Sequence, residues 1–118
     1  MGNITALYVT GNATFGGTVG ISGVVSNVTI DGATSLGGDV VTNGFQNYTG
    51  AVTLNNDITL TGNSNGNITF GSTVDGAAAG GQFLKVNTGG VVTMNSAVGA
   101  TNALSTIVTD ALGTIILK

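Results

Sequence analysis

One short sequence motif recurs along the chain at a nearly constant interval. It opens with Thr-Gly at residues 10, 49 and 88, so that successive copies begin 39 residues apart. It closes with threonine and a large apolar residue, at Thr14-Phe15, Thr53-Leu54 and Thr93-Met94. Internal repetition with a period of 20–50 residues is typical of solenoids, propellers and arrays. The repeat therefore divides the 118 residues into three units of a single domain, 1–40, 41–80 and 81–118.

Further apolar positions share the phase of this motif. Units 1 and 3 also match in detail, with Asp31 corresponding to Asp110 and Leu36 to Ile115, which indicates a longer repeat of 79 residues with two unlike halves. We expect equivalent residues of the three units to stack in columns through the core. The expected columns are Phe15, Leu54 and Met94; Val19, Ile58 and Val98; and Ile30, Phe70 and Ile107 or Val108.

The pattern within each unit predicts short β-strands. Apolar residues alternate with Thr or Asn between glycines, as in "AVTL" and "DITLTG", and this period of two is a strand signal. Segment 97–112 is different, because its apolar residues also fit helical spacing. The equivalent stretch of unit 1 contains three glycines and several β-branched residues, which disfavour helix. We interpret 97–112 as strand and corner, with a short helix as the alternative.

The scarcity of charge favours a solenoid over a β-sandwich. Only 6% of the residues are charged, against roughly 25% in ordinary soluble domains. Stacked coils place equivalent side chains about 4.8 Å apart, where like charges repel but Thr and Asn do not. Proline, which would remove a ladder hydrogen bond, is absent. Two coils of roughly 20 residues in each unit predict about six coils and a rod about 30 Å long.

Three stretches resemble a known protein family. The segments "YTGAVTLNNDITLTG", "GNITFGSTVDGA" and "GGVVTMNSAVGATNALSTI" are similar to the β-strand repeats of filamentous-haemagglutinin-like and autotransporter-like bacterial adhesins. The resemblance implies an all-β, right-handed parallel β-helix that is exported and displayed outside the cell, at the bacterial cell surface. The chain is much shorter than such adhesins, and we identify no signal peptide, export domain or cap in it.

Composition excludes several classes of function. Two distant lysines, Lys85 and Lys118, cannot neutralise a run of phosphates, so we expect no nucleic-acid partner. His and Cys are absent, which removes the usual transition-metal ligands and the usual bases and thiols of nucleophilic catalysis. No apolar run approaches the ~20 residues that cross a bilayer, so we expect no membrane insertion. No motif calls for a cofactor.

We therefore expect a structural, non-catalytic extracellular protein of adhesin or filament type. The ends of a solenoid expose strand edges that can template another chain. Two versions stay open: a small subunit that stacks head-to-tail with copies of itself into fibres, and an excised stretch of a long adhesin stalk. Glycans or proteins of a host or surface are further candidate partners.

Two alternatives belong to other classes. A polysaccharide-acting β-helix enzyme needs paired carboxylates. The acids fall mostly at different phases of the repeat, at or beside Gly or Asn, and Asp31 and Asp110, which share a phase, would lie several coils apart. We therefore interpret the acids as corner residues. An ice-binding solenoid needs a Thr-x-Thr ladder in every coil, and only Thr59-Leu60-Thr61 has that spacing. The repeat of calcium-binding β-rolls is missing. The acids concerned are Asp31, Asp39, Asp57, Asp75 and Asp110.

Five Asn-x-Thr sequons are candidate glycan sites. An asparagine in a turn followed by a threonine in a strand also produces this motif by chance. Glycan attachment and chance occurrence therefore both stay open. The intact mass of the protein distinguishes them. The candidate residues are Asn3, Asn12, Asn27, Asn47 and Asn67.

Overall fold

The described part of the chain is built from β-strands. The computed structural model describes residues 4–20, 25–109 and 113–118, and the regular structure in these ranges is strand throughout. The strands are β1 (Ile4–Val9), β2 (Ala13–Phe15), β3 (Val25–Ile30), β4 (Thr34–Leu36), β5 (Val40–Thr42), β6 (Gln46–Tyr48), β7 (Val52–Leu54), β8 (Ile58–Gly62), β9 (Ile68–Phe70), β10 (Val74–Gly76), β11 (Phe83–Thr88), β12 (Val91–Met94), β13 (Thr106–Thr109) and β14 (Thr114–Leu117).

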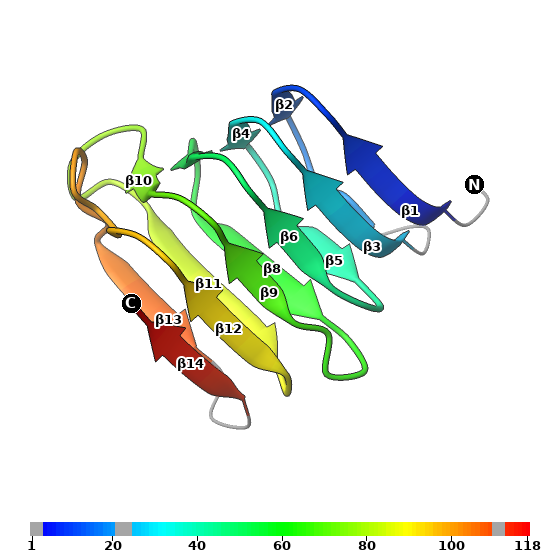
Figure 1. The fold of residues 1–118 in the computed structure, drawn as a ribbon. Coiled ribbons are helices and arrows are strands. Elements are labelled where there is room, and N and C mark those ends of the chain that lie inside the picture. The colour runs from blue at the N-terminus through cyan, green and yellow to red at the C-terminus, as the bar shows by residue number, and fades with distance from the viewer. Residues whose placement is uncertain (1–3, 21–24, 110–112) are drawn as a thin grey trace.

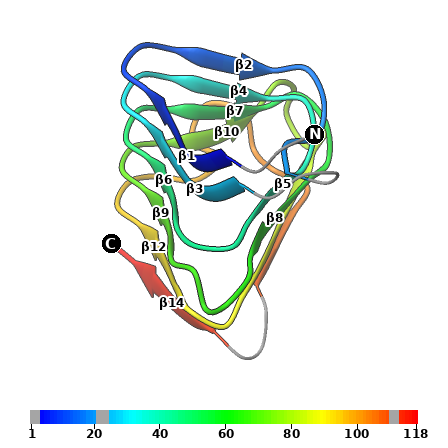
Figure 2. The ribbon, with the colours of Figure 1, turned by 90° about the vertical axis from the view of Figure 1, so that its right-hand side faces the viewer.

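The strands form three parallel sheets around one interior. Sheet A has six strands in the order β1-β3-β6-β9-β12-β14, sheet B has the order β10-β7-β4-β2, and sheet C has the order β13-β11-β8-β5. Figure 1 shows the coils lying side by side from the N-terminal to the C-terminal end. Figure 2 looks along the rod from the N-terminal end, and the chain turns clockwise as it recedes. The expected right-handed parallel β-helix is confirmed.

The number of coils is slightly lower than expected. Sheet A has six strands, one from each successive pass of the chain. The five intervals between them are five full turns, whereas the sequence predicts about six coils. The molecule measures 37 × 29 × 22 Å, in keeping with a short rod.

Alternation along each strand places apolar side chains inside. In β8, for example, Ile58 and Leu60 are fully buried while Thr59 and Thr61 face outward and are half-buried. Burying an aliphatic side chain of this size contributes about 1.5–3 kcal/mol. Because the same alternation recurs in the short strands of all three sheets, one continuous core runs the length of the rod.

Two of the expected columns are correct across units 1 and 2. Phe15 pairs with Leu36, which pairs with Leu54, so the first column continues through sheet B. Ile30 pairs with Tyr48, which pairs with Phe70, and the rings of Tyr48 and Phe70 stack with their centroids 5.6 Å apart. In both cases a spacing of 39–40 residues corresponds to two coils.

The expected columns are wrong in unit 3. Met94 lies on sheet A beside Phe70, not on sheet B with Leu54. Val98 bridges Val74 on sheet B, so it does not continue a column with Ile58. Ile107 and Val108 lie on sheet C and are 40% and 43% exposed, so neither extends the Phe70 column.

A smaller correction concerns Val19. It bridges Val40, which pairs with Leu60, so its row reaches Leu60 and not Ile58 two positions earlier. The shift of two residues keeps both side chains on the same face of sheet C.

Coils of unequal length explain these errors. Val40 and Leu60 are paired at a separation of 20 residues, whereas Ile58 and Leu84 are paired at a separation of 26. The additional residues lie in the corners "GNSNG" (62–66) and "GAAAGG" (76–81). Ser64 and Asn65 have φ of 54° and 59° in the first of these corners. A corner can contain extra residues without disturbing the strands. Beyond such a corner, residues that are 39–40 positions apart in the sequence no longer occupy equivalent positions in the coils.

Segment 97–112 is strand and corner as far as the structure describes it. Strand β13 occupies Thr106–Thr109 and pairs in parallel with β11. Residues 110–112, including Asp110, lie outside the described residues.

A buried polar cluster lies inside the core between sheets A and C. The Tyr48 hydroxyl donates to Gln46 Oε1 at 2.7 Å, and both side chains are fully buried. Gln46 Nε2 in turn donates to the carbonyl oxygen of Thr61 at 3.0 Å and to Thr42 Oγ1 at 3.2 Å. Since buried polar groups are costly when unpaired, this cluster favours a single register for the coils that it joins.

Candidate functional site

The C-terminal end of the rod exposes aliphatic side chains that would be core residues in an inner coil. On β14, Ile115 and Leu117 pair with the buried Val92 and Met94 and therefore share their inward direction. They are nevertheless 40% and 69% exposed. Ile107 of β13 likewise continues the inward row of Leu84. Among the described strands, β13 and β14 are edge strands of their sheets.

The N-terminal end presents a less exposed version of the same surface. Leu7 and Val9 of β1 pair with the buried Val28 and Ile30, so both point toward the interior, where they are half-buried. Phe15 of β2 is also half-buried and packs on the core. Both ends of the described rod thus combine a strand edge with inward-facing apolar residues.

Six polar side chains bridge neighbouring coils. Each supplies an oxygen that accepts a hydrogen bond from a backbone N–H of the following coil, at 2.8–3.0 Å. We call these oxygens the bridging acceptors. They belong to Asn12, Asn27, Asp39, Asp57, Asn67 and Asp75, and they bind the N–H groups of Ala33, Phe45, Thr59, Phe83, Val91 and Thr101, respectively.

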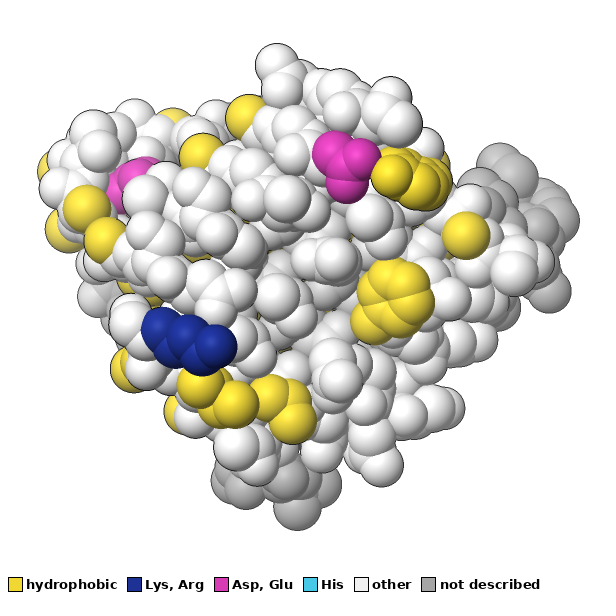
Figure 3. All heavy atoms as spheres, in the orientation of Figure 1, with side chains coloured by type: hydrophobic (Ala, Val, Ile, Leu, Met, Phe, Trp, Pro, Cys, Tyr) yellow, Lys and Arg dark blue, Asp and Glu magenta, His cyan; other side chains and the backbone are white. Residues whose placement is uncertain are grey.

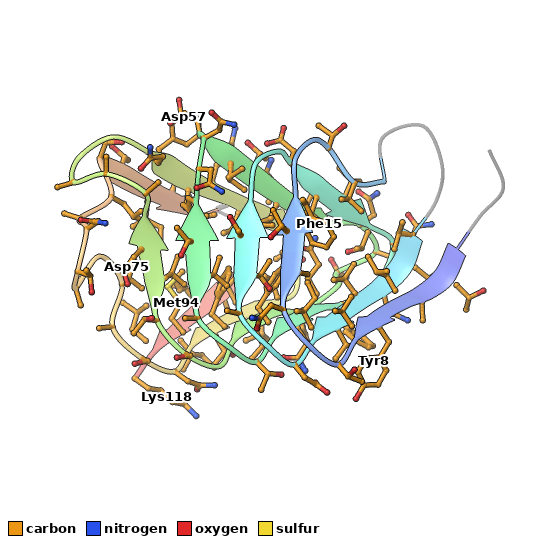
Figure 4. The ribbon with its side chains drawn as sticks, turned by 90° about the horizontal axis from the view of Figure 1, so that it is seen from above. Tyr8, Phe15, Asp57, Asp75, Met94 and Lys118 are labelled. Carbon is orange, nitrogen blue, oxygen red and sulfur yellow. The ribbon has the colours of Figure 1, made fainter. Side chains whose placement is uncertain are left out.

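The aspartates in the described residues all act as hydrogen-bond acceptors between coils. Asp39 and Asp57 precede strands β5 and β8 as bridging acceptors at corners. Asp75 is not a corner residue, since it faces outward from β10 and accepts bonds from Thr101 and Asn102. Asp31 follows β3 and accepts the Tyr8 hydroxyl at 2.9 Å. Figure 4 shows Asp57 and Asp75 at separate places on the surface.

No cluster of three or more potential metal ligands occurs within residues 4–20, 25–109 and 113–118. Within the same ranges, no helix is long and apolar enough to cross a membrane.

The single Thr-x-Thr of the sequence does not form a ladder. Thr59 and Thr61 of β8 pair with Lys85 and Asn87 on β11. On the other side, Thr61 pairs with Val41 of β5. The outward rows of sheet C are therefore chemically mixed.

The sequon asparagines have several structural roles. Asn12, Asn27 and Asn67 use Oδ1 as bridging acceptors, while a glycan would be attached through Nδ2. Asn47 is half-buried on the outer face of β6, and Asn3 lies outside the described residues. The glycan sites stay a prediction that intact mass would test.

Two tyrosines have perturbed acidity for different reasons. Complete burial raises the pKa of Tyr48 far above its ordinary value of 10.0. The hydrogen bond to Asp31, followed by the negative charge of that carboxylate, raises the pKa of the exposed Tyr8. Both phenols therefore stay protonated at neutral pH.

Sequence reasoning missed the Tyr8–Asp31 pair and the buried Gln46–Tyr48 pair. The alternation in "ALYV" of β1 places Leu7 and Val9 inside, and it could have placed Tyr8 outside. No comparable signal was available for Gln46, because a buried glutamine breaks the expected alternation.

Comparisons with protein-family models, curated proteins and solved structures found no match to this chain.

Proposed function

We propose that this chain is a structural, non-catalytic β-solenoid of bacterial adhesin or filament type that works outside the cell. Its coils extend a longer rod, either by head-to-tail stacking of separate copies or as part of a long stalk. The observation that carries the proposal is the exposure of the inward-facing residues Ile107, Ile115 and Leu117 on edge strands. Contiguous apolar surface of this kind marks an interaction site, and a further coil would bury it.

The use of the aspartates supports a role without catalysis. Asp39, Asp57 and Asp75 each accept backbone N–H groups of the next coil, so their oxygens take part in holding the rod together. General acid–base chemistry requires a second titratable group in position to exchange protons. The neutral outer faces fit a spacer that presents few charges to its surroundings.

Parallel stacking specifies a register for the contact between two copies. The inward row of Val92 and Ile115 is the row that begins at Leu7, and the row of Met94 and Leu117 begins at Val9. A second copy that continues sheet A would place its Leu7 beside Ile115 and its Val9 beside Leu117. Such a contact is heterologous and does not close, so it grows into a fibre.

Adjacent isoleucines on β14 provide a matched pair of variants. Ile115 and Ile116 are 40% and 39% exposed but face opposite sides of the sheet, inward and outward. Ile115→Lys would place an unpaired charge in the stacked interface, which is costly, whereas Ile116→Lys would leave its charge in water. Negative-stain electron microscopy and sedimentation velocity report the assembly state, and circular dichroism verifies the fold.

Long unbranched fibres that form with Ile116→Lys but not with Ile115→Lys support the filament version. A monodisperse protein at high concentration contradicts self-stacking and favours the stalk version. Turnover of a polysaccharide, or thermal hysteresis in a freezing assay, would contradict the structural role and favour the enzyme or ice-binding alternative.

A further inference from the structure

The exposed aromatic residues gather on one face of the rod. The chain has four Phe and two Tyr. Tyr48 and Phe70 are buried, and Phe15 and Phe83 are half-buried. Of the two exposed rings, Tyr8 (63% exposed) lies on the outer face of β1 and Phe45 (43% exposed) lies immediately before β6, both near the N-terminal end of sheet A. The other exposed large hydrophobic side chains of the described residues are aliphatic and belong to β13 and β14.

The position of each ring follows from strand alternation. Tyr8 lies between the inward-facing Leu7 and Val9 on β1. Phe45 immediately precedes the buried Gln46 of β6, so it takes an outward direction. Figure 4 shows Tyr8 projecting from the outer side of β1.

A carboxylate fixes the Tyr8 hydroxyl. The hydroxyl donates to Asp31 Oδ2 at 2.9 Å across a separation of 23 residues, so the bond joins two coils. A hydroxyl bonded to a carboxylate is about twice as strong a hydrogen bond as a neutral pair. The bond uses one oxygen of the carboxylate, so Asp31 places a further hydrogen-bond acceptor beside an exposed aromatic side chain.

Neutral polar residues of β3 occupy the space between the two rings. Thr29 pairs with Tyr8 on one side and with Asn47 on the other. Asn27 Oδ1 accepts the Phe45 backbone N–H at 3.0 Å, so its NH2 group is the part that can donate to a ligand. Since β1, β3 and β6 are consecutive in the sheet, Tyr8 and Phe45 lie two coils apart, ~10 Å along the rod axis. Phe45 is also offset by two residues along the strand, because the row of Tyr8 ends at Asn47.

Charge selects against an anionic ligand on this surface. The nearest formal charge is the Asp31 carboxylate, which would repel an anion. Lys85 faces outward from sheet C, and Lys118 follows β14 at the other end of the rod. Figure 3 looks onto sheet A and shows a mostly uncharged surface, on which an acidic side chain touches a hydrophobic one near the N-terminal end. The surface combines apolar planes, hydroxyls, amides and a carboxylate.

We propose that the outer face of β1, β3 and β6 is a binding surface for a neutral polysaccharide, with Tyr8, Phe45, Asp31 and Asn27 as its contact residues. The C–H faces of sugar rings would pack on the two aromatic planes, and sugar hydroxyls would donate to Asp31 and accept from Asn27. Spacing of the rings by two coils suits a chain of several sugars better than a single sugar. This inference deepens the proposed function, on which it rests, by naming the class of surface ligand.

Affinity gel electrophoresis with soluble neutral polymers tests the proposal. Hydroxyethylcellulose, laminarin and mannan are the probes, and alginate is the anionic comparison. We expect at least one neutral polymer to retard the wild-type protein. The double variant Tyr8→Ala/Phe45→Ala should bind at least fivefold more weakly, and Tyr8→Phe, which keeps the ring but loses the bond to Asp31, should bind with intermediate strength.

The matched control is Val108→Ala/Ile116→Ala, which removes two exposed side chains at the other end of the rod and should bind as wild type. Intact mass shows whether the protein carries a glycan of its own, which would compete for the same surface. Lack of retardation by every neutral polymer, retardation by alginate alone, or equal binding by the wild type and the aromatic double variant would overturn the proposal. Electron microscopy of the same samples separates this outcome from a failure of assembly, because the aromatic face and the rod ends are different surfaces.

Discussion

At the scale of single residues, the core contains one hydroxyl that lacks a partner in the described structure. Thr34 is 2% exposed, and its Oγ1 has no hydrogen-bond partner there. The other residues in its row on sheet B are apolar: Ala13, Val52, Val74 and Val98. A buried polar group without a partner carries its desolvation cost without compensation.

Thr34→Val should therefore stabilise the protein, by about 1 kcal/mol. Urea unfolding followed by circular dichroism would measure the gain. The control is Thr42→Val, because the Thr42 hydroxyl donates to the Gly44 carbonyl oxygen at 2.8 Å and accepts from Gln46. Thr42→Val should destabilise the protein. If both variants stabilise it, the gain comes from added hydrophobicity and not from removal of an unpaired hydroxyl.

The buried Tyr48 predicts a loss of stability in alkali. The unfolded chain ionises this phenol near its ordinary pKa of 10.0, whereas burial raises the pKa in the folded state. Above pH ~10 the unfolded state therefore releases a proton that the folded state keeps, and the free energy of unfolding falls by at most about 1.4 kcal/mol per pH unit. Below that pH the contribution of Tyr48 is fully present.

Urea unfolding at a series of pH values would measure this slope. Tyr48→Phe should flatten it above pH ~10, although the variant loses stability at neutral pH because Gln46 Oε1 is left without its donor. Tyr8→Phe, at an exposed position, should keep most of the slope. An identical alkaline slope in the wild type and Tyr48→Phe would contradict the assignment to Tyr48.

At the scale of elements, the bridging acceptors fix the approach of one coil to the next. Asp57→Ala removes the acceptor of the Phe83 N–H and should cost about 1 kcal/mol. Asp57→Asn keeps a side-chain oxygen and should recover most of the loss. Asp31→Ala is the comparison: it removes the acceptor of the exposed Tyr8 hydroxyl, which water can replace, and no backbone N–H among the described bonds, so it should cost less than Asp57→Ala. Thermal unfolding distinguishes the three, and equal losses for Asp57→Ala and Asp57→Asn would contradict the prediction.

Close contact between coils also makes particular glycines irreplaceable. A Cβ built at the buried Gly66 would overlap the backbone carbonyl of Gly44 on the preceding coil, whereas a Cβ at Gly16 would meet nothing within 4 Å. Gly66→Ala should destabilise by about 1–3 kcal/mol. Gly16→Ala should be neutral or slightly stabilising, because it restricts the unfolded chain. Denaturation midpoints provide the comparison, and equal tolerance of both changes would show that the coils can move apart.

At the scale of the whole molecule, the rod should open from its ends. Each coil contacts only its neighbours, so stability is shared locally along the axis. Amides of β13 and β14 should exchange hydrogen faster than those of β6 and β9, which lie between paired strands on both sides in sheet A. Hydrogen exchange with mass spectrometry would show this gradient. Uniform protection would indicate that the described coils unfold as one cooperative unit, or that both ends are covered by self-association.

The sequence predicts the class of fold because alternation and scarce charge act at every coil. It predicts the Phe15–Leu54 and Ile30–Phe70 columns because the coils between them add up to a regular interval. It does not predict the partners of Met94, Val98 and Ile107, because the number of residues that a Gly- and Asn-rich corner absorbs leaves no periodic signal. The Tyr8–Asp31 pair was missed for a related reason, since the register of neighbouring coils sets it.

The bridging acceptors also give the rod a direction. In all six bonds, the side-chain oxygen belongs to the earlier coil and the backbone N–H to the later one. When a new coil forms on the preceding one, its backbone N–H groups therefore meet side-chain oxygens that are already in place. Winding that begins at the amino terminus and advances as the polypeptide emerges is matched to the polarity of these six bonds.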